Sequence, residues 1–89
     1  MEYRIDCNGI TTNKDFHEKL KQVLSLPDWY GHNLDAMHDC LTEIAAPVKL
    51  TLDNFSALKA ALGEYAGKVM FVLHICAEEN PNLEISLEN

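Results

Sequence analysis

The sequence predicts an α/β domain built on a small parallel sheet. Short segments in which apolar and polar residues alternate, as in strands, are separated by segments whose apolar residues recur at helical spacing. Strands separated by helices are typical of a parallel sheet. The chain has 89 residues, of which 47% are hydrophobic. That is enough for one hydrophobic core and too little for two, so we expect residues 1–89 to form a single domain.

The first strand and the first helix follow from the pattern at the start of the chain. Tyr3, Ile5 and Cys7 alternate with polar residues, which predicts a half-buried strand. An Asn-Gly turn follows this strand. We expect Asn13 to cap a helix over residues 14–24, because an asparagine side chain accepts a hydrogen bond from the first turn.

An aromatic loop and a second helix come next. The loop, residues 26–32, contains Trp29 and Tyr30. We expect the ring of Tyr30 to cover the core and the ring of Trp29 to be exposed, because aromatic groups beside charged ones are common at binding surfaces. Asn33 is a suitable cap for a helix that ends near Ile44.

The later part of the chain contains two alternating segments that predict strands, residues 48–52 and 83–87. Between them, Asp53 or Asn54 can start a short helix that Gly63 ends. The segment 69–76 is ambiguous. Its β-branched and aromatic residues favour a strand, whereas its continuation to an Asn-Pro stop favours a helix.

The second helix has two chemically different sides. At about 100° per residue, one face carries its apolar residues, which are Leu34, Met37, Leu41 and Ile44. Asp35, Asp39 and Glu43 fall on the opposite face. Carboxylates spaced four residues apart destabilise an isolated helix by roughly 0.2–0.5 kcal/mol per pair. A solvated acidic face fits this pattern, and so does a surface on which a basic partner turns the repulsion into binding energy.

The overall charge and the cysteines restrict the class of protein. The formal net charge of −7 disfavours nucleic acid and anionic membranes as partners and favours a basic protein. No apolar run is long enough to span a membrane, and the charged N-terminus does not fit a signal peptide, so we expect a cytoplasmic protein. Cys7, Cys40 and Cys76 are widely spaced and odd in number, so we expect reduced, buried thiols.

In several fixed-spacing motifs the sequence resembles the barstar family of ribonuclease inhibitors. The motifs are Leu26-Pro27, Trp29-Tyr30-Gly31, Asn33-Leu34-Asp35-Ala36 and Asp39-Cys40-Leu41-Thr42, with Asp15, His17, Leu20, Lys21 and Leu24 upstream. They cover about a quarter of the chain, and the remainder agrees in pattern and in the order of elements. The resemblance implies a three-stranded parallel sheet packed with about four helices. It also supports a helix over residues 68–79.

The resemblance further implies a function as an inhibitor that binds a small basic ribonuclease of the barnase type and keeps it inactive. Asp39 would occupy the pocket that takes an RNA phosphate, Asp35 would accept hydrogen bonds from the rim, and Trp29 would lie against the catalytic histidine. The residues expected to contact the partner are Trp29, Gly31, Asn33, Leu34, Asp35, His38, Asp39, Thr42 and Glu43.

This chain departs from the family pattern in its contact region. His38 and Ile44 stand where the best-known member has tryptophan, and Glu43 replaces a glycine. Ile75 falls where the family has an acidic contact residue. Glu78 or Glu79, one turn later, are candidates to replace it.

Two other classes of function are an enzyme and a binding module for a different protein. Cys40 and His38 could form a nucleophile pair, but on a helix their side chains point about 160° apart, so we do not expect an enzyme. An acidic module for a different basic protein remains open. We expect no cofactor, and a monomer in the free state.

Two groups of residues could be considered as metal sites. Three of them could share one face, namely His32, Asp35 and Asp39, and His74 with Glu78 forms a pair one turn apart. Neither group has a recognisable zinc spacing, so we expect no metal. We interpret His17, His32 and His74 as lone surface histidines.

Overall fold

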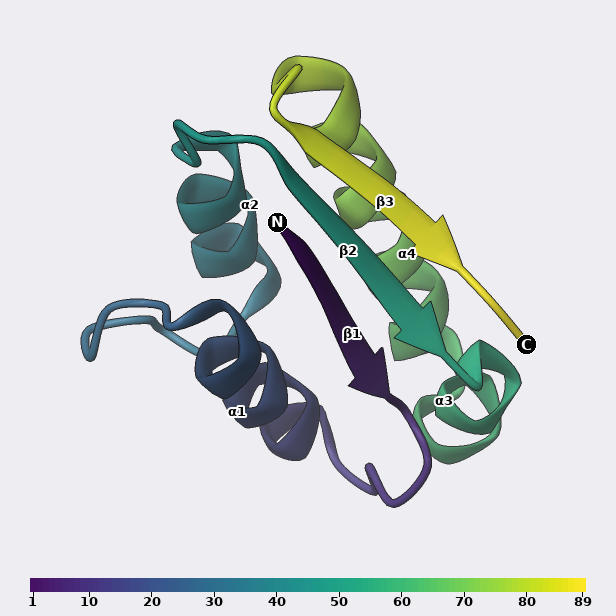
Figure 1. Cartoon of the computed structure of the whole chain (residues 1–89). Helices are drawn as coiled ribbons and strands as arrows, with labels where there is room; N and C mark the ends of the chain where they lie inside the picture. The colour runs from purple at the N-terminus through teal and green to yellow at the C-terminus, as the bar shows by residue number, and fades with distance from the viewer.

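The computed structural model describes all residues from 1 to 89 and contains three strands and four helices (Figure 1). In chain order, the elements are β1 (Glu2–Asp6), α1 (Asn13–Leu24), α2 (Leu34–Thr42), β2 (Val48–Asp53), α3 (Phe55–Leu62), α4 (Glu64–Glu79) and β3 (Leu83–Leu87). The ambiguous segment 69–76 is therefore helical and lies inside α4, which begins four residues before the expected start.

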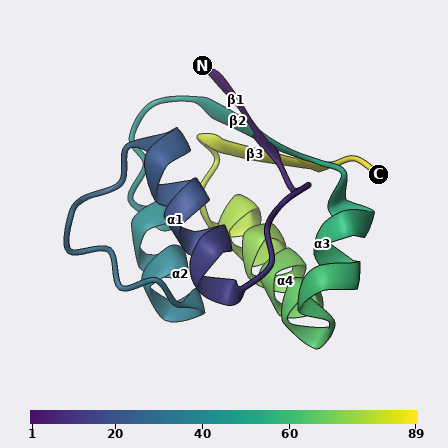
Figure 2. The same cartoon turned by 90° about the horizontal axis from the view of Figure 1, so that it is seen from below.

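The three strands form one parallel sheet in the order β1-β2-β3. Tyr3 pairs with Leu50, and Leu50 pairs with Ile85. Parallel strands need long crossover connections, and the helix pairs α1–α2 and α3–α4 supply them. All four helices lie on the same face of the sheet, so the molecule has two layers (Figure 2). The expected α/β architecture with a three-stranded parallel sheet is confirmed.

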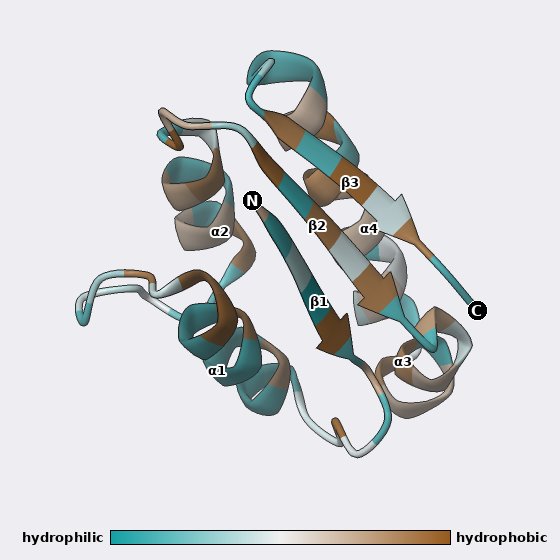
Figure 3. Ribbon diagram, in the orientation of Figure 1, coloured by the Kyte–Doolittle hydropathy of each residue, from teal (hydrophilic) through white to brown (hydrophobic).

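The hydrophobic core lies between the two layers. Ile5, Leu50 and Leu52 on the inner face of the sheet are fully buried. The helices contribute Phe16, Leu20, Met37, Leu41, Leu58, Val69 and Leu73, each fully buried. Figure 3 shows the resulting alternation of hydrophobic and hydrophilic residues along β2 and β3. Each large apolar side chain buried in this way contributes roughly 1.5–3 kcal/mol.

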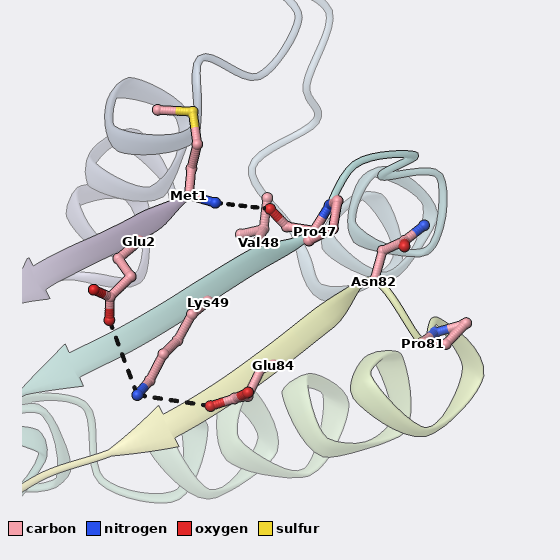
Figure 4. Close-up of a pocket in the computed structure, with 8 residues that line it drawn as sticks. All are labelled: Met1, Glu2, Pro47, Val48, Lys49, Pro81, Asn82 and Glu84. Carbon is pink, nitrogen blue, oxygen red and sulfur yellow. Dashed lines mark hydrogen bonds and ion pairs between the residues drawn. The ribbon is translucent and has the colours of Figure 1, made fainter.

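The outer face of the sheet is charged and cross-linked by ion pairs. Arg4 on β1 binds both carboxylate oxygens of Asp53, at 2.8 and 2.9 Å, and an oxygen of Glu88 at 2.8 Å. The hydrogen bonds from Arg4 hold the pKa of Asp53 below its ordinary value. Lys49 on β2 lies between Glu2 and Glu84, at 3.9 and 3.7 Å (Figure 4).

A pocket of about 250 Å³ lies where the three strands begin (Figure 4). Its lining consists of Met1, Glu2, Pro47, Val48, Lys49, Pro81, Asn82 and Glu84. None of the residues expected to contact a partner is among them.

Two of the expected helix caps need adjustment. The first helix is capped by Thr12, whose hydroxyl accepts from the N–H of Asp15 at 3.0 Å, so the expectation for Asn13 was wrong by one residue. Thr12 caps the helix because it has the extended backbone conformation that a capping residue requires. Asn54 precedes α3 as expected, but its side chain donates to Asp6 and does not cap the helix.

The end of α2 is fixed by a buried asparagine from another part of the chain. Asn80, which follows α4, is only 4% exposed. Its side-chain amide donates to the carbonyl of Leu41 at 2.9 Å and to that of Ile44 at 3.0 Å, and its oxygen accepts from the N–H of Asn82. Asn80 therefore supplies hydrogen bonds to carbonyl groups that the end of a helix leaves free.

We predict that Asn80→Ala lowers the free energy of unfolding by about 2–4 kcal/mol, because the carbonyl groups of Leu41 and Ile44 lose their short hydrogen bonds from this buried side chain. Urea denaturation followed by circular dichroism measures this change. Asn89→Ala, an exposed position at the C-terminus, is the matched control and should change stability by less than about 0.5 kcal/mol. Equal effects of the two substitutions would contradict the role of Asn80.

Candidate functional site

The candidate site begins where Asn33 starts α2. The backbone of Asn33 is extended, and its side-chain oxygen accepts from the N–H of Ala36 at 2.8 Å. Its side-chain nitrogen donates to the carbonyl of Gly31 at 3.1 Å. The expected cap is confirmed. Because the same side chain holds both the helix and the loop before it, Asn33 fixes the direction in which α2 leaves the loop.

The acidic column consists of Asp35, Asp39 and Glu43, and all three residues are exposed. The opposite side of α2 is buried, with Met37 and Leu41 fully covered. No Lys or Arg nitrogen forms an ion pair with any carboxylate of the acidic column. The sequence therefore predicted the two sides of this helix correctly, and the acidic column is free to meet a cation from outside.

The loop before α2 contacts the first turn of the helix through Gly31. Tyr30 is 2% exposed and Trp29 is 70% exposed, so both expectations for the aromatic pair are confirmed. Gly31 lies close to α2, because a side chain there would come within 3.2 Å of the amide nitrogen of Asn33 and 3.3 Å of the methyl group of Ala36. A glycine at this position lets the loop backbone approach the start of the acidic column.

One flank of α2 meets the end of α4. The Nε2 atom of His38 is 2.5 Å from a carboxylate oxygen of Glu79, and its Nδ1 atom is 3.8 Å from Asp39. The hydrogen bond to Glu79 raises the pKa of His38 above its ordinary value. Glu79 was one of two candidates left open from sequence, and the structure brings it to α2 through His38.

Two further residues of the expected contact set have mainly structural contacts. Leu34 is half-buried and packs against the core. The hydroxyl of Thr42 donates to the carbonyl of His38 at 2.7 Å. The helix ends at Thr42, two residues earlier than expected, because its last N–H bonds switch to the tighter three-residue spacing at Glu43 and Ile44.

The interpretation of His17 as a surface residue was wrong. Its side chain is completely buried, with one ring nitrogen 2.6 Å from the hydroxyl of Tyr30 and the other 2.6 Å from the hydroxyl of Tyr65. His32 is half-buried and pairs with Glu18 at 2.7 Å. His74 is exposed, as expected.

Cys40 does not have the surroundings of an activated thiol. Cys40 is buried, and burial together with the neighbouring carboxylates raises the pKa of its thiol, which opposes a role as nucleophile. All three cysteines are free and buried, as expected. No group of three or more His, Cys, Asp or Glu side chains is placed to hold a metal ion. None of the four helices has the length and apolar composition that a membrane span requires.

Comparison with known proteins decides the family. The model of the family described as Barstar (barnase inhibitor) matches residues 1–88. The chain belongs to the barstar family. The protein called "Putative ribonuclease inhibitor YrdF" from Bacillus subtilis (strain 168) is 45% identical over 76 residues, which is 84% of each of the two chains. The barstar resemblance, inferred from motifs covering a quarter of the sequence, therefore extends over nearly the whole chain.

We predict that an NMR titration of the His38 ring gives a midpoint above that of an ordinary histidine, because the carboxylate of Glu79 stabilises the charged ring. Glu79→Gln should lower this midpoint, whereas Glu78→Gln, one residue away, should leave it unchanged. Because the pKa is raised in the folded state, the stabilising contribution of the pair is present at low pH and is lost as the pH rises through the pKa of the folded state. An unchanged midpoint in Glu79→Gln would disprove the pairing in solution.

Proposed function

We propose that this chain inhibits a small basic ribonuclease of the barnase type by covering its active site with the acidic column and the preceding loop. The description of the barstar family and the name of the Bacillus relative support ribonuclease inhibition. The observation that carries the proposal is the acidic column itself, in which three exposed carboxylates on the outward side of a short helix have no Lys or Arg partner.

Asp39 is the proposed anchor of the complex. Its side chain is 77% exposed, and its one close charged neighbour is the edge of the His38 ring. A ribonuclease must hold an RNA phosphate with cationic groups, and a carboxylate on a rigid helix presents the same sign of charge to them. Asp35, one turn earlier, is proposed to accept hydrogen bonds from the rim of the active site.

The loop is proposed to contribute shape and an aromatic contact. Trp29 presents a large exposed ring in the loop that leads into α2, and we propose that it lies against the catalytic histidine of the enzyme. Gly31 and Asn33 are proposed to allow close approach of the loop backbone to the enzyme surface. The proposed contact set is completed by Leu34, His38, Thr42 and Glu43.

We propose that the end of α4, beside α2, influences which ribonuclease the chain binds. Ile75 is half-buried and carries no charge where the family has an acidic contact residue, and Glu79 one turn later places a carboxylate beside α2. We propose that Glu79 takes part in the contact in place of a carboxylate at position 75, which would shift the cation that it meets on the partner.

We propose that the chain acts as an inhibitor and not as an enzyme, and that it needs no cofactor. We further propose that it is a monomer when free and that it acts in the cytoplasm of the cell that makes the ribonuclease. If a panel of barnase-type ribonucleases shows no inhibition while another basic protein binds the acidic column, the chain is an acidic interaction module with a different partner.

We predict that Asp39→Asn weakens inhibition of a barnase-type ribonuclease by about 30-fold to several thousand-fold. This corresponds to about 2–5 kcal/mol for removing one partner of a desolvated charge pair. Asp35→Asn should weaken it less. Inhibition constants from an RNA cleavage assay give the comparison, and thermal melting should show that both variants stay folded because both side chains are exposed.

Glu64→Gln is the matched control for these variants, because it removes one exposed carboxylate at the start of α4, outside the acidic column. It should leave the inhibition constant within about twofold. If Glu64→Gln and Asp39→Asn weakened inhibition equally, the effect would come from net charge and not from the position of Asp39. Unchanged inhibition in folded Asp39→Asn would refute the anchor.

We also predict that raising the ionic strength from about 0.05 to 0.5 M slows association by about 10-fold or more, because salt screens attraction between the acidic column and a basic enzyme. Stopped-flow mixing measures the association rate. A double variant, Asp35→Asn with Glu43→Gln, should show a shallower dependence on salt. A rate independent of salt would argue against electrostatic steering.

A further inference from the structure

A buried imidazole connects three separate parts of the structure. His17 lies on α1 with no exposed surface. Its Nδ1 atom is 2.6 Å from the hydroxyl of Tyr30, in the loop before α2, and its Nε2 atom is 2.6 Å from the hydroxyl of Tyr65, in the first turn of α4. The side chains of Tyr65, His17 and Tyr30 therefore form one continuous hydrogen-bonded chain from α4 through α1 to the loop.

A second contact from the next residue of α1 holds the same loop. The carboxylate of Glu18 accepts a hydrogen bond from Nε2 of His32 at 2.7 Å, and Nδ1 of His32 lies 2.8 Å from the backbone carbonyl of Tyr30. His32 itself has a positive φ of 53°, a conformation that side chains other than glycine rarely adopt. Two adjacent residues of α1 thus fix both the side chain and the backbone of Tyr30.

We propose that His17 is a positioning residue for the partner-binding loop. Its hydrogen bond to Tyr65 anchors the ring to α4, and its hydrogen bond to Tyr30 holds the neighbouring Trp29 and Gly31 in place. This inference rests on the proposed function and adds a positioning network to the proposed contact surface. Because His17 is buried behind the loop, it acts on a partner only through Tyr30.

The donors and acceptors around His17 match a neutral imidazole ring. A neutral imidazole has one N–H donor and one bare nitrogen acceptor, and a tyrosine hydroxyl both donates and accepts. One hydroxyl donates to the bare nitrogen while the other accepts from the N–H. No buried side-chain polar atom of the protein lacks a partner. A protonated ring would donate at both nitrogens, so the hydroxyl that donates to the neutral ring would have to turn its O–H away and find another acceptor.

The surroundings of His17 contain no carboxylate in contact that would favour a charged ring. Tyr30 and Tyr65 contact it directly, and Cys40 of α2 is a neighbour of Tyr30. The charged group that acts on His17 is His32, which pairs with Glu18. Burial, with a smaller contribution from His32, lowers the pKa of His17 to about 4. Because the folded state disfavours the proton, stability falls as the pH drops below the ordinary histidine pKa, and the folded protein itself takes up the proton near pH 4.

The single tryptophan makes the loop directly measurable without a partner. Trp29 is the only tryptophan in the chain and is adjacent to Tyr30. Time-resolved fluorescence anisotropy at pH 7 should show a larger amplitude of fast Trp29 motion in Tyr30→Phe and His17→Gln than in the wild type, and a smaller increase in Tyr65→Phe. Each tyrosine variant removes one oxygen atom and keeps the ring, so both remain informative if His17→Gln does not fold.

Tyr3→Phe is the matched control, because the Tyr3 hydroxyl on β1 bonds only to the sulfur of Met1. It should leave the motion of Trp29 unchanged. As the pH is lowered from 7 to 4 with the far-ultraviolet circular dichroism still native, the fast amplitude should rise in the wild type. In His17→Gln it should already be high and respond less to pH. Equal anisotropy in Tyr30→Phe and the wild type, or the same pH response in His17→Gln and the wild type, would overturn the proposal.

A second arm of the experiment connects the loop to inhibition. With a purified barnase-type ribonuclease as the probe, Tyr30→Phe and His17→Gln should dissociate roughly 3- to 10-fold faster than the wild type, the effect expected of one lost hydrogen bond. Tyr3→Phe should dissociate at the wild-type rate. If the wild type does not bind the probe, the proposed function fails while the anisotropy of the free protein still decides the role of His17. Binding with unchanged dissociation in both variants would overturn the positioning role alone.

Discussion

The burial of Met37 and Leu41 fixes the rotation of α2, and the presentation of the acidic column depends on that rotation. Both side chains are fully covered by the core. A rotation by one residue, about 100°, would expose one of them and turn a carboxylate inward, where an unpaired charge is strongly disfavoured. The apolar and the electrostatic contributions act in the same direction. The helix therefore has one stable orientation, and the hydrophobic core determines where the charge points.

The burial of Met37 and Leu41 alone would not stabilise so short a helix. A helix of nine residues is marginal in isolation, so α2 depends on contacts at both ends. Asn33 caps the first turn and ties it to Gly31, while Asn80 binds the carbonyl groups at the other end. The hydrogen bonds of His17 hold the loop before it. These polar contacts come from α1, from the loops and from the end of α4, and they convert a weak helix into a rigid surface.

The sequence predicted what neighbouring residues determine and missed what distant residues determine. Alternation identified the strands, and helical spacing identified both sides of α2 because each face is encoded within the helix itself. The buried state of His17 was missed because its partners, Tyr30 and Tyr65, lie 13 and 48 residues away. The contact of Glu79 with His38 spans 41 residues and was missed for the same reason. From sequence, Glu79 was only one of two candidates to replace an acidic residue at position 75. Helical periodicity places a residue on a face but does not show what covers that face.

The distribution of cations argues that the acidic column is more than a consequence of an acidic composition. The chain has 14 Asp and Glu residues and only 7 Lys and Arg residues, so with one carboxylate for each cation half of the carboxylates have no Lys or Arg partner. Even so, Arg4 and Lys49 each hold two carboxylates on the outer face of the sheet. On α2, where a lysine four residues from an aspartate would stabilise the helix, no such residue occurs, and the nearest ionisable cation is His38, already shared with Glu79. A surface selected for stability would pair these charges, whereas one that binds a basic partner must leave them free for that partner.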